Sequence, residues 1–185
     1  MAKKKVFKKF TGRAAWAMIY SPDEGFGKEF WKISLYPDID TIMAIKDAGI
    51  QLKAKDDDGE KSGVQGKFFT FRRDTTSKFG GSEVQPVSPP WVYDKKGKKL
   101  VSYTQDEDGD YQREGEPVLI GNGSEVEVTV EVYNTKSFGK QCRLYSVKIL
   151  DLIEYNPDEE EDEEEVEEQE VEVVVKKKVN KKVPF

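Results

Sequence analysis

Residues 125–133, with the sequence EVEVTVEVY, alternate strictly between two kinds of side chain. Successive side chains of a β-strand point to opposite faces of a sheet, so this period of two predicts a strand with one apolar face. We expect that face to be buried in the fold. The apolar set is Val126, Val128, Val130 and Val132, and the opposite set is Glu125, Glu127, Thr129, Glu131 and Tyr133.

Other segments have strand patterns too. Residues 134–139 predict a turn, and residues 140–155 predict a long final strand whose alternation slips near Asp151, as at a β-bulge. Near the start of the chain, residues 13–20 and 28–36 predict two strands. The segment between them is rich in Gly, Pro and Asp, so we expect a hairpin.

One short helix is predicted after this hairpin, over residues 38–48. Asp38 is a good N-cap, and Gly49 is typical of the position that follows a helix. The expected buried stripe of this helix consists of Ile39, Ile42 and Met43.

The middle of the chain gives shorter signals. Residues 66–73 predict a strand, and residues 91–93 with 100–103 predict a hairpin that has a basic tip. Residues 74–90 and 106–116 lack apolar periodicity, so we expect two loops there, the second of them acidic.

Strands therefore dominate, and they do not alternate with helices. This order argues for a mostly antiparallel barrel or sandwich rather than a doubly wound parallel sheet. About five principal strands and one helix favour an all-β fold with one short helix, an OB-fold-like antiparallel β-barrel.

Charge divides the chain into two parts. Twelve of its 36 acidic residues lie in residues 158–172 and five of its 30 basic residues in 176–182, so the remainder has formal charge +1, although the whole chain has −6. Blocks of like charge repel internally and stay solvated. We expect a basic N-terminal arm at residues 1–12, an OB-fold domain at 13–155 and a disordered C-terminal tail at 156–185. For the arm, a solubilising terminus and a nucleic-acid contact both stay open.

The composition argues against several kinds of site. There is no histidine and Cys142 is the only cysteine, so neither a Ser-His-Asp triad nor a cysteine–histidine metal cage can form. Asp106, Asp108 and Asp110 are similar to the start of a calcium loop, but Tyr111 stands where glycine is required. No apolar run approaches the length of a membrane span. We expect a non-enzymatic protein without cofactor, metal or membrane contact, in a reducing cytoplasmic compartment.

Aromatic and basic side chains interleave on several predicted strands and at two loop tips. Single-stranded nucleic acid is bound by such surfaces, because cations follow the phosphates and aromatic rings stack on bases. A place in the core is the alternative for each aromatic residue, and we assign Trp16, Trp31 and Phe68 to the core. The candidate DNA-binding residues are Phe26, Lys28, Phe30, Lys32, Tyr36, Lys67, Phe69, Phe71, Arg73, Lys136, Phe138, Lys140, Arg143 and Tyr145.

Several motifs together point to one family. They are the start MAKK, residues 94–99 (DKKGKK), residues 117–124 (PVLIGNGS) ahead of the valine-rich strand, and an acidic tail that ends in Phe185. This combination resembles the single-stranded DNA-binding replication proteins of tailed phages, notably those of short-tailed phages. The PVLIGNGS stretch is its most specific part. The resemblance implies an OB-fold and a DNA groove lined with basic and aromatic residues.

The resemblance also implies two uses for the tail. The anionic tail would compete with DNA for the groove and, once released, would dock the replicative DNA polymerase and the primase–helicase through Val183, Pro184 and Phe185. In one respect the chain departs from the family, because five lysines separate the acidic run from Phe185. They imply a differently charged partner, a second DNA contact or a fold-back onto the glutamates, and these alternatives stay open.

We therefore expect a sequence-tolerant single-stranded DNA-binding protein of phage DNA replication, recombination and repair, placed in the host cytoplasm. A homodimer is an open possibility. One alternative is an acidic-tailed interaction protein, a chaperone or nucleic-acid mimic that does not bind DNA. Another is an RNA-binding OB domain.

Overall fold

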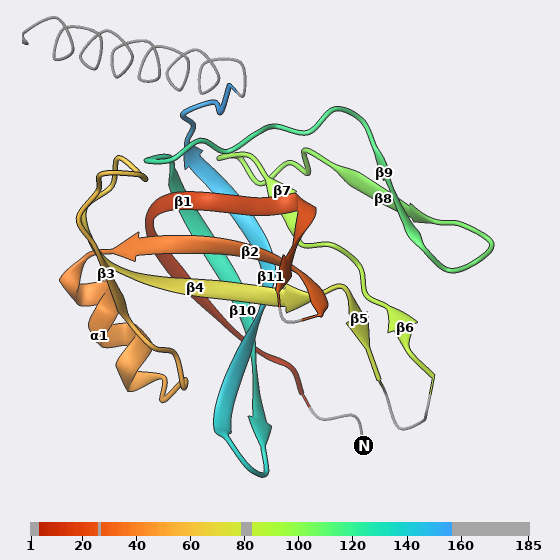
Figure 1. Ribbon diagram of the computed structural model, residues 1–185, viewed down its shortest axis with the longest axis horizontal. Coiled ribbons are helices and arrows are strands. Elements are labelled where there is room, and N and C mark those ends of the chain that lie inside the picture. The colour runs from red at the N-terminus through yellow and green to blue at the C-terminus, as the bar shows by residue number, and fades with distance from the viewer. Residues whose placement is uncertain (1–3, 26, 79–82, 157–185) are drawn as a thin grey trace, which may run out of the picture. The chain divides into compact units, whose positions relative to one another are not determined.

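The computed structural model describes residues 4–25, 27–78 and 83–156. Contacts divide the chain into two units, Met1–Glu154 and Tyr155–Phe185, and the barrel belongs to the first. Nearly all of the predicted tail lies outside the described residues. The elements in chain order are β1 (Val6–Gly25), β2 (Lys28–Pro37), α1 (Ile39–Asp47), β3 (Lys55–Asp57), β4 (Gly66–Asp74), β5 (Thr76–Ser77), β6 (Gln85–Pro86), β7 (Trp91–Tyr93), β8 (Ser102–Gln105), β9 (Tyr111–Glu114), β10 (Glu125–Thr135) and β11 (Gly139–Asp151) (Figure 1).

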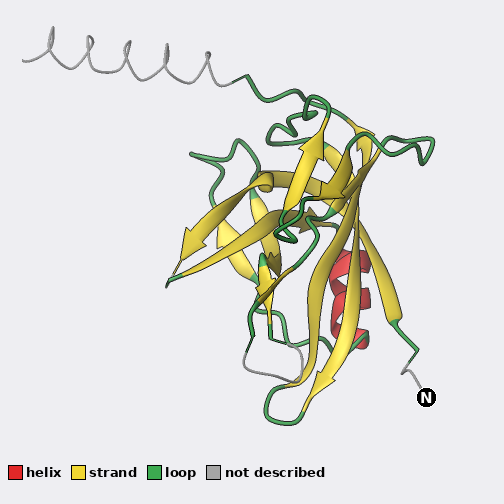
Figure 2. Ribbon diagram, turned by 90° about the vertical axis from the view of Figure 1, so that its right-hand side faces the viewer, coloured by secondary structure: helices red, strands yellow, loops and turns green. Residues whose placement is uncertain are grey.

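In the described ranges, the fold is mostly β with one helix, as predicted. Seven strands form one sheet in the order β3-β4-β2-β1-β10-β11-β7, in which only the β11–β7 pair is parallel. The long strands β4 and β11 also contact each other, so the sheet curls into a barrel (Figures 1 and 2). The five long strands, in chain order, are β1, β2, β4, β10 and β11. The first, β1, lies between β2 and β10, and the third, β4, contacts the fifth, β11. This is a small five-stranded barrel of the OB type.

Strand β1 is unusually long because it belongs to two sides of the barrel. Its first part pairs with β10 and its second part with β2, and Gly12 pairs with both Val126 and Pro37. A Cβ atom on Gly12 would lie 2.7 Å from the carbonyl oxygen of Tyr36, so the close crossing requires glycine. Residues 6–12, predicted as part of an arm, are therefore the first part of this strand.

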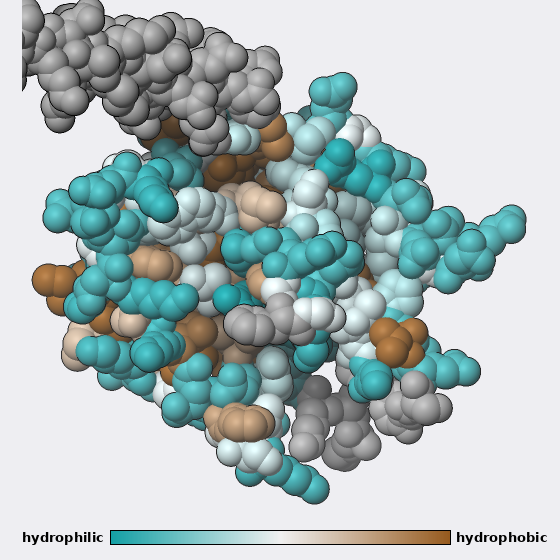
Figure 3. All heavy atoms as spheres, viewed as in Figure 1, coloured by the Kyte–Doolittle hydropathy of each residue, from teal (hydrophilic) through white to brown (hydrophobic). Residues whose placement is uncertain are grey.

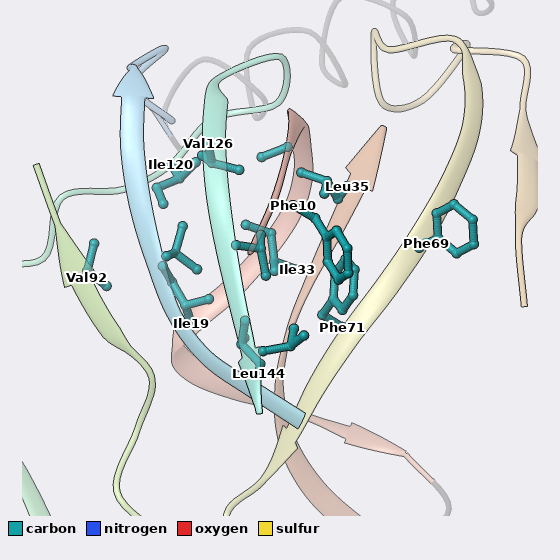
Figure 4. Close-up of a cluster of buried hydrophobic side chains, with 14 of the residues drawn as sticks. Phe10, Ile19, Ile33, Leu35, Phe69, Phe71, Val92, Ile120, Val126 and Leu144 are labelled. Carbon is teal, nitrogen blue, oxygen red and sulfur yellow. The ribbon is translucent and has the colours of Figure 1, made fainter. Parts of the chain in front are cut away.

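The barrel interior holds one hydrophobic core, drawn in Figure 4. The prediction for β10 is confirmed at Val126, Val128 and Val130, which are fully buried. Burial of each such side chain contributes about 1.5–3 kcal/mol relative to leaving it exposed. At the end of the strand the prediction fails in part, because Val132 is only partly buried and Glu131, predicted to face outward, is 7% exposed. Side chains from the other strands complete the core, among them Phe10, Ile19, Ile33, Leu35, Phe69, Phe71 and Leu144.

The ends of helix α1 are those predicted. A carboxylate oxygen of Asp38 accepts a hydrogen bond from the backbone N–H of Thr41 at 2.8 Å, and Gly49 follows the helix with φ 70°.

The predicted buried stripe of α1 is wrong. Ile45 is 1% exposed, whereas Ile39 is 77% and Met43 is 51% exposed. Ile42 is only partly buried against the core. The helix rests on the barrel through a narrow row of side chains, and its packing angle decides which apolar residues that row includes.

Several predicted loops and strand ends differ in the structure. The predicted acidic loop at residues 106–116 contains β9, which pairs with β8, and the predicted loop at 74–90 contains the short pair β5–β6. The predicted hairpin partner of β7 is reduced to one bridge between Tyr93 and Lys99. The predicted bulge is confirmed, since the register of β11 shifts between Ile149 and Asp151. Within the described residues, no helix is long and apolar enough to cross a membrane.

Candidate nucleic-acid interface

The turn between β10 and β11 presents an exposed aromatic ring on a fixed backbone. The Phe138 side chain is 74% exposed. Its backbone N–H donates to Thr135 Oγ1 at 3.0 Å, and its carbonyl oxygen accepts from Gln141 Nε2 at 2.8 Å. Gly139, with φ 68°, closes the turn. The backbone that carries the ring is therefore fixed, and the ring itself has no place in the core.

Two lysines flank this ring. Lys136 is exposed and forms no ion pair within the described residues. The Nζ atom of Lys140 lies 3.5 Å from the carbonyl oxygen of Ala48, the C-cap of α1, where the helix dipole favours a cation. Figure 3 shows that hydrophilic side chains dominate this face of the molecule and that apolar ones are scattered among them. The turn thus combines a cationic surface with an aromatic ring.

A second group of cations lies on the outer face of β2 and β4. Lys32 and Arg72 are paired across these strands, and the Arg72 guanidinium lies over the Phe30 ring at 4.6 Å from its centroid. Lys32 forms an ion pair with Asp23, and its hydrogen bond is the main reason that the pKa of Asp23 is lowered. Arg72 is exposed and forms no ion pair within the described part of the chain, so it is the cation on this face that is best placed for a phosphate.

Other predicted DNA-binding residues lie around these two groups. Lys28 is exposed at the start of β2, and its predicted companion Phe26 lies outside the described residues, as do Val183, Pro184 and Phe185. Lys67 is exposed at the far end of β4, with its Nζ atom 2.9 Å from a carboxylate oxygen of Asp56.

Arg143 and Tyr145 are both partly buried on β11. The Arg143 guanidinium bonds one carboxylate oxygen of Glu131 through Nε at 3.0 Å and Nη2 at 2.9 Å. Glu131 itself is only 7% exposed. The ring of Tyr145 packs against Phe7 with 4.8 Å between centroids. Both residues already have internal partners, which weakens them as DNA contacts.

Four predicted stacking residues are buried instead. Phe69 and Phe71 are on the inner face of β4 in the main cluster, at 2% and 0% exposed. Phe30 and Tyr36 lie on the outer face of β2, but each is covered, Phe30 by Arg72 and Tyr36 by the segment that follows β3. Burial leaves none of these rings a face for a base, so we remove them from the interface.

Tyr36 has a structural role that its sequence position did not indicate. Its hydroxyl donates to a carboxylate oxygen of Asp57 at 2.5 Å, and that oxygen also accepts from Ser62 at 2.6 Å. Burial and this carboxylate raise the pKa of Tyr36, and the two donated hydrogen bonds lower the pKa of Asp57. The contact holds the loop after β3 against the outer face of the sheet.

Arg73 was predicted to contact phosphates, but in the structure its side chain has internal partners. Its Nε donates to the Ser88 carbonyl oxygen at 2.7 Å, its Nη1 to the Leu144 carbonyl oxygen at 3.3 Å and its Nη2 to Ser88 Oγ at 3.3 Å. Burial lowers the pKa of its guanidinium. The side chain therefore ties β4 to β11 where the barrel closes.

Two exposed residues were missed as candidates. Arg72 lies on the outer face of β4, opposite the predicted binding residues Phe69, Phe71 and Arg73. Trp16, which was assigned to the core, is 38% exposed. Of the other two residues assigned to the core, Trp31 is buried, with 6% of its surface exposed. Phe68 is partly buried against Ala15, Tyr36 and Val64. No sequence signal marks Trp16, because its exposure results from an irregularity in β1.

No group of three or more Asp, Glu or Cys side chains in the described ranges is placed to hold a metal ion. Cys142 is partly buried, and burial raises the pKa of its thiol to about 12, so the reactive thiolate is scarce at neutral pH.

The fold and this surface define a five-stranded barrel of the OB type with an aromatic and basic turn between its last two strands. No protein-family model and no curated protein matches the chain. Among solved structures, the chain is similar to the crystal structure of gp2.5, a single-stranded DNA binding protein encoded by bacteriophage T7. The TM-score is 0.48 at 20% identity, over 83% of this chain and 90% of that chain.

Proposed function

We propose that this chain is a sequence-tolerant single-stranded DNA-binding protein. The observation that carries the proposal is the β10–β11 turn, which holds the exposed Phe138 between Lys136 and Lys140. The side chains of Thr135 and Gln141 fix the backbone of Phe138 by hydrogen bonds. Stacking on an aromatic ring accepts any base, and lysines follow phosphates without reading sequence. In barrels of the OB type, the loop between the fourth and fifth strands and the face of strands two and three are the usual site for oligonucleotides.

The outer face of β2 and β4 supports the same proposal. Arg72 is exposed on it, beside Lys32, and Lys28 lies at the turn that leads into β2. We propose that Arg72 and Lys28, with Lys136 and Lys140, contact the phosphates, and that Lys32, which is paired with Asp23, adds positive charge beside them.

Replacing Phe138 with alanine is expected to weaken binding of a poly-dT oligonucleotide by about 5- to 150-fold, since one stacked base is worth about 1–3 kcal/mol. Stability should change by less than about 0.5 kcal/mol, because the ring is exposed. Fluorescence anisotropy gives the affinity and urea unfolding gives the stability.

Ile39→Ala is the matched control, because Ile39 is an apolar side chain that is 77% exposed on α1, close to the 74% of Phe138. It should leave the affinity unchanged. Equal effects of the two substitutions, or none from Phe138→Ala, would remove the turn from the interface.

We propose further that the protein acts in phage DNA replication, recombination and repair, and that its acidic tail competes with DNA. In this proposal the released tail recruits the replicative polymerase and the primase–helicase. The support is the charge division of the chain, with twelve acidic residues in 158–172 tethered to a body of formal charge +1. A tethered segment has an effective concentration in the mM range.

Ending the chain after Tyr155 is expected to tighten DNA binding by roughly tenfold at low salt. This magnitude follows if the tail binds the groove with a Kd near 0.1 mM, as weakly as non-specific DNA. The gain should shrink as salt screens the tail. Anisotropy titrations of both proteins measure it, and an unchanged or weaker affinity after truncation would contradict the competition.

A further inference from the structure

Trp16 has an unusual backbone for an aromatic residue. The pairing of β1 with β2 shifts register between Ala15 and Met18, so Trp16 lies in a bulge. Its φ is 47°, and no other non-glycine residue in the described part of the chain has a positive φ. A side chain with a Cβ is strained in this region, and such residues cluster at functional sites.

The strained residue is held in place from the neighbouring loop. The backbone N–H of Trp16 donates to Asn122 Oδ1 at 2.9 Å. Beside it, the N–H of Ala14 donates to the Ser124 carbonyl oxygen at 2.7 Å, and the N–H of Gly123 donates to the Ala14 carbonyl oxygen at 2.8 Å. The fold thus fixes a conformation that glycine would adopt more easily, yet a tryptophan is present.

The ring of Trp16 is the exposed end of a row of three aromatic rings. Its edge meets Phe68 at 6.0 Å between centroids, and Phe68 stacks on Tyr36 at 5.1 Å with 25° between the planes. Tyr36 is fixed by its hydrogen bond to Asp57. The indole is 38% exposed, so it is supported from behind and still open to solvent.

Cations share this outer face. Met18, two residues after Trp16, is opposite Lys32, and Lys32 is opposite Arg72. The three strands β1, β2 and β4 therefore bring a supported indole and an exposed guanidinium to one surface. This combination fits a strand whose bases stack and whose phosphates need positive charge.

We infer that Trp16 is a base-stacking residue, and that single-stranded DNA crosses the outer face of β1, β2 and β4 with a phosphate at Arg72. The inference rests on the proposed function and adds a second aromatic contact to that of Phe138. It also gives a reason for the strained backbone, because the bulge aims the indole outward.

The test uses Trp16→Gly in the full-length chain, because glycine suits φ 47° and removes the whole side chain without straining the backbone. We expect a folded protein whose affinity for a poly-dT oligonucleotide is about 5- to 150-fold weaker than that of the wild type. Trp16→Phe, which keeps an aromatic ring, should bind within about threefold of the wild type. Wild-type affinity in Trp16→Gly would overturn the inference and leave the proposed function intact, whereas no binding by the wild type would overturn the proposed function itself.

Tryptophan fluorescence gives a second readout that holds even if Trp16→Gly does not fold. Trp31 is buried and Trp91 is partly covered, with Lys99 over its ring at 3.9 Å. Saturation with poly-dT should quench the wild type, and Trp16→Phe should lose most of that quenching. The same quenching in both proteins would overturn the inference.

Discussion

Replacing Phe71 with alanine is expected to lower the free energy of unfolding by about 3–5 kcal/mol. The ring is 0% exposed and lies 6.0 Å from the ring of Phe10 between centroids, beside which it is drawn in Figure 4. Its removal leaves a cavity that the closed barrel cannot readily fill. Since small domains are stable by only about 5–15 kcal/mol, much of the protein would be unfolded at modest urea concentrations.

The measurement is urea unfolding of Phe71→Ala beside Phe138→Ala. The two variants delete the same ring, one from the core and the other from an exposed turn, so only the first should move the midpoint. A Phe71→Ala protein that keeps its stability but no longer binds DNA would return Phe71 to the interface.

Replacing Arg73 with methionine should have the second largest effect on stability, a loss of about 2–4 kcal/mol. Methionine keeps the apolar stem but leaves the carbonyl oxygens of Ser88 and Leu144 without their guanidinium donors. An unsatisfied buried polar group costs about 1–3 kcal/mol, and hydrogen bonds to a charged donor are stronger than average. Because these bonds join β4 to β11, their loss weakens the closure of the barrel.

Arg72→Met is the matched control, since the neighbouring arginine points to the outer face. It should cost less than about 1 kcal/mol of stability, yet weaken DNA binding and reduce the salt slope by about 0.7, the value of one phosphate contact on a single strand. If the two variants exchanged these outcomes, the assignment of inner and outer faces on β4 would be wrong.

Strand β4 illustrates what the sequence could and could not predict. Its period of two separates Phe68, Thr70 and Arg72 from Phe69, Phe71 and Arg73, and the structure confirms that division. Both sets contain aromatic residues and an arginine, so hydropathy does not indicate which set faces inward. In β10 one set is all valine, and there the inner face could be predicted directly.

Tertiary contacts explain the remaining differences between the sequence predictions and the structure. The caps of α1 depend on local chemistry and were predicted, but the buried Ile45 depends on how the helix meets the barrel. Tyr36 is covered by a loop held at Asp57, and Trp16 is exposed by a bulge. Neither the covering loop nor the bulge produces a periodic pattern of hydrophobic residues in the sequence. The turn around Phe138 was predicted, because a phenylalanine between lysines and glycine has no packing partner nearby in the sequence.

The most direct test of the proposed function is the salt dependence of binding. A labelled poly-dT oligonucleotide is titrated with the full-length protein by fluorescence anisotropy at several salt concentrations. Phosphate contacts from Lys28, Arg72, Lys136 and neighbouring cations predict that log Kobs falls linearly with log salt, by about 0.7 for each contact. A slope of about −2 to −4 is therefore expected for roughly three to six contacts. No binding even at the lowest salt would contradict the proposal, and an acidic-tailed interaction protein would then be the better account of this chain.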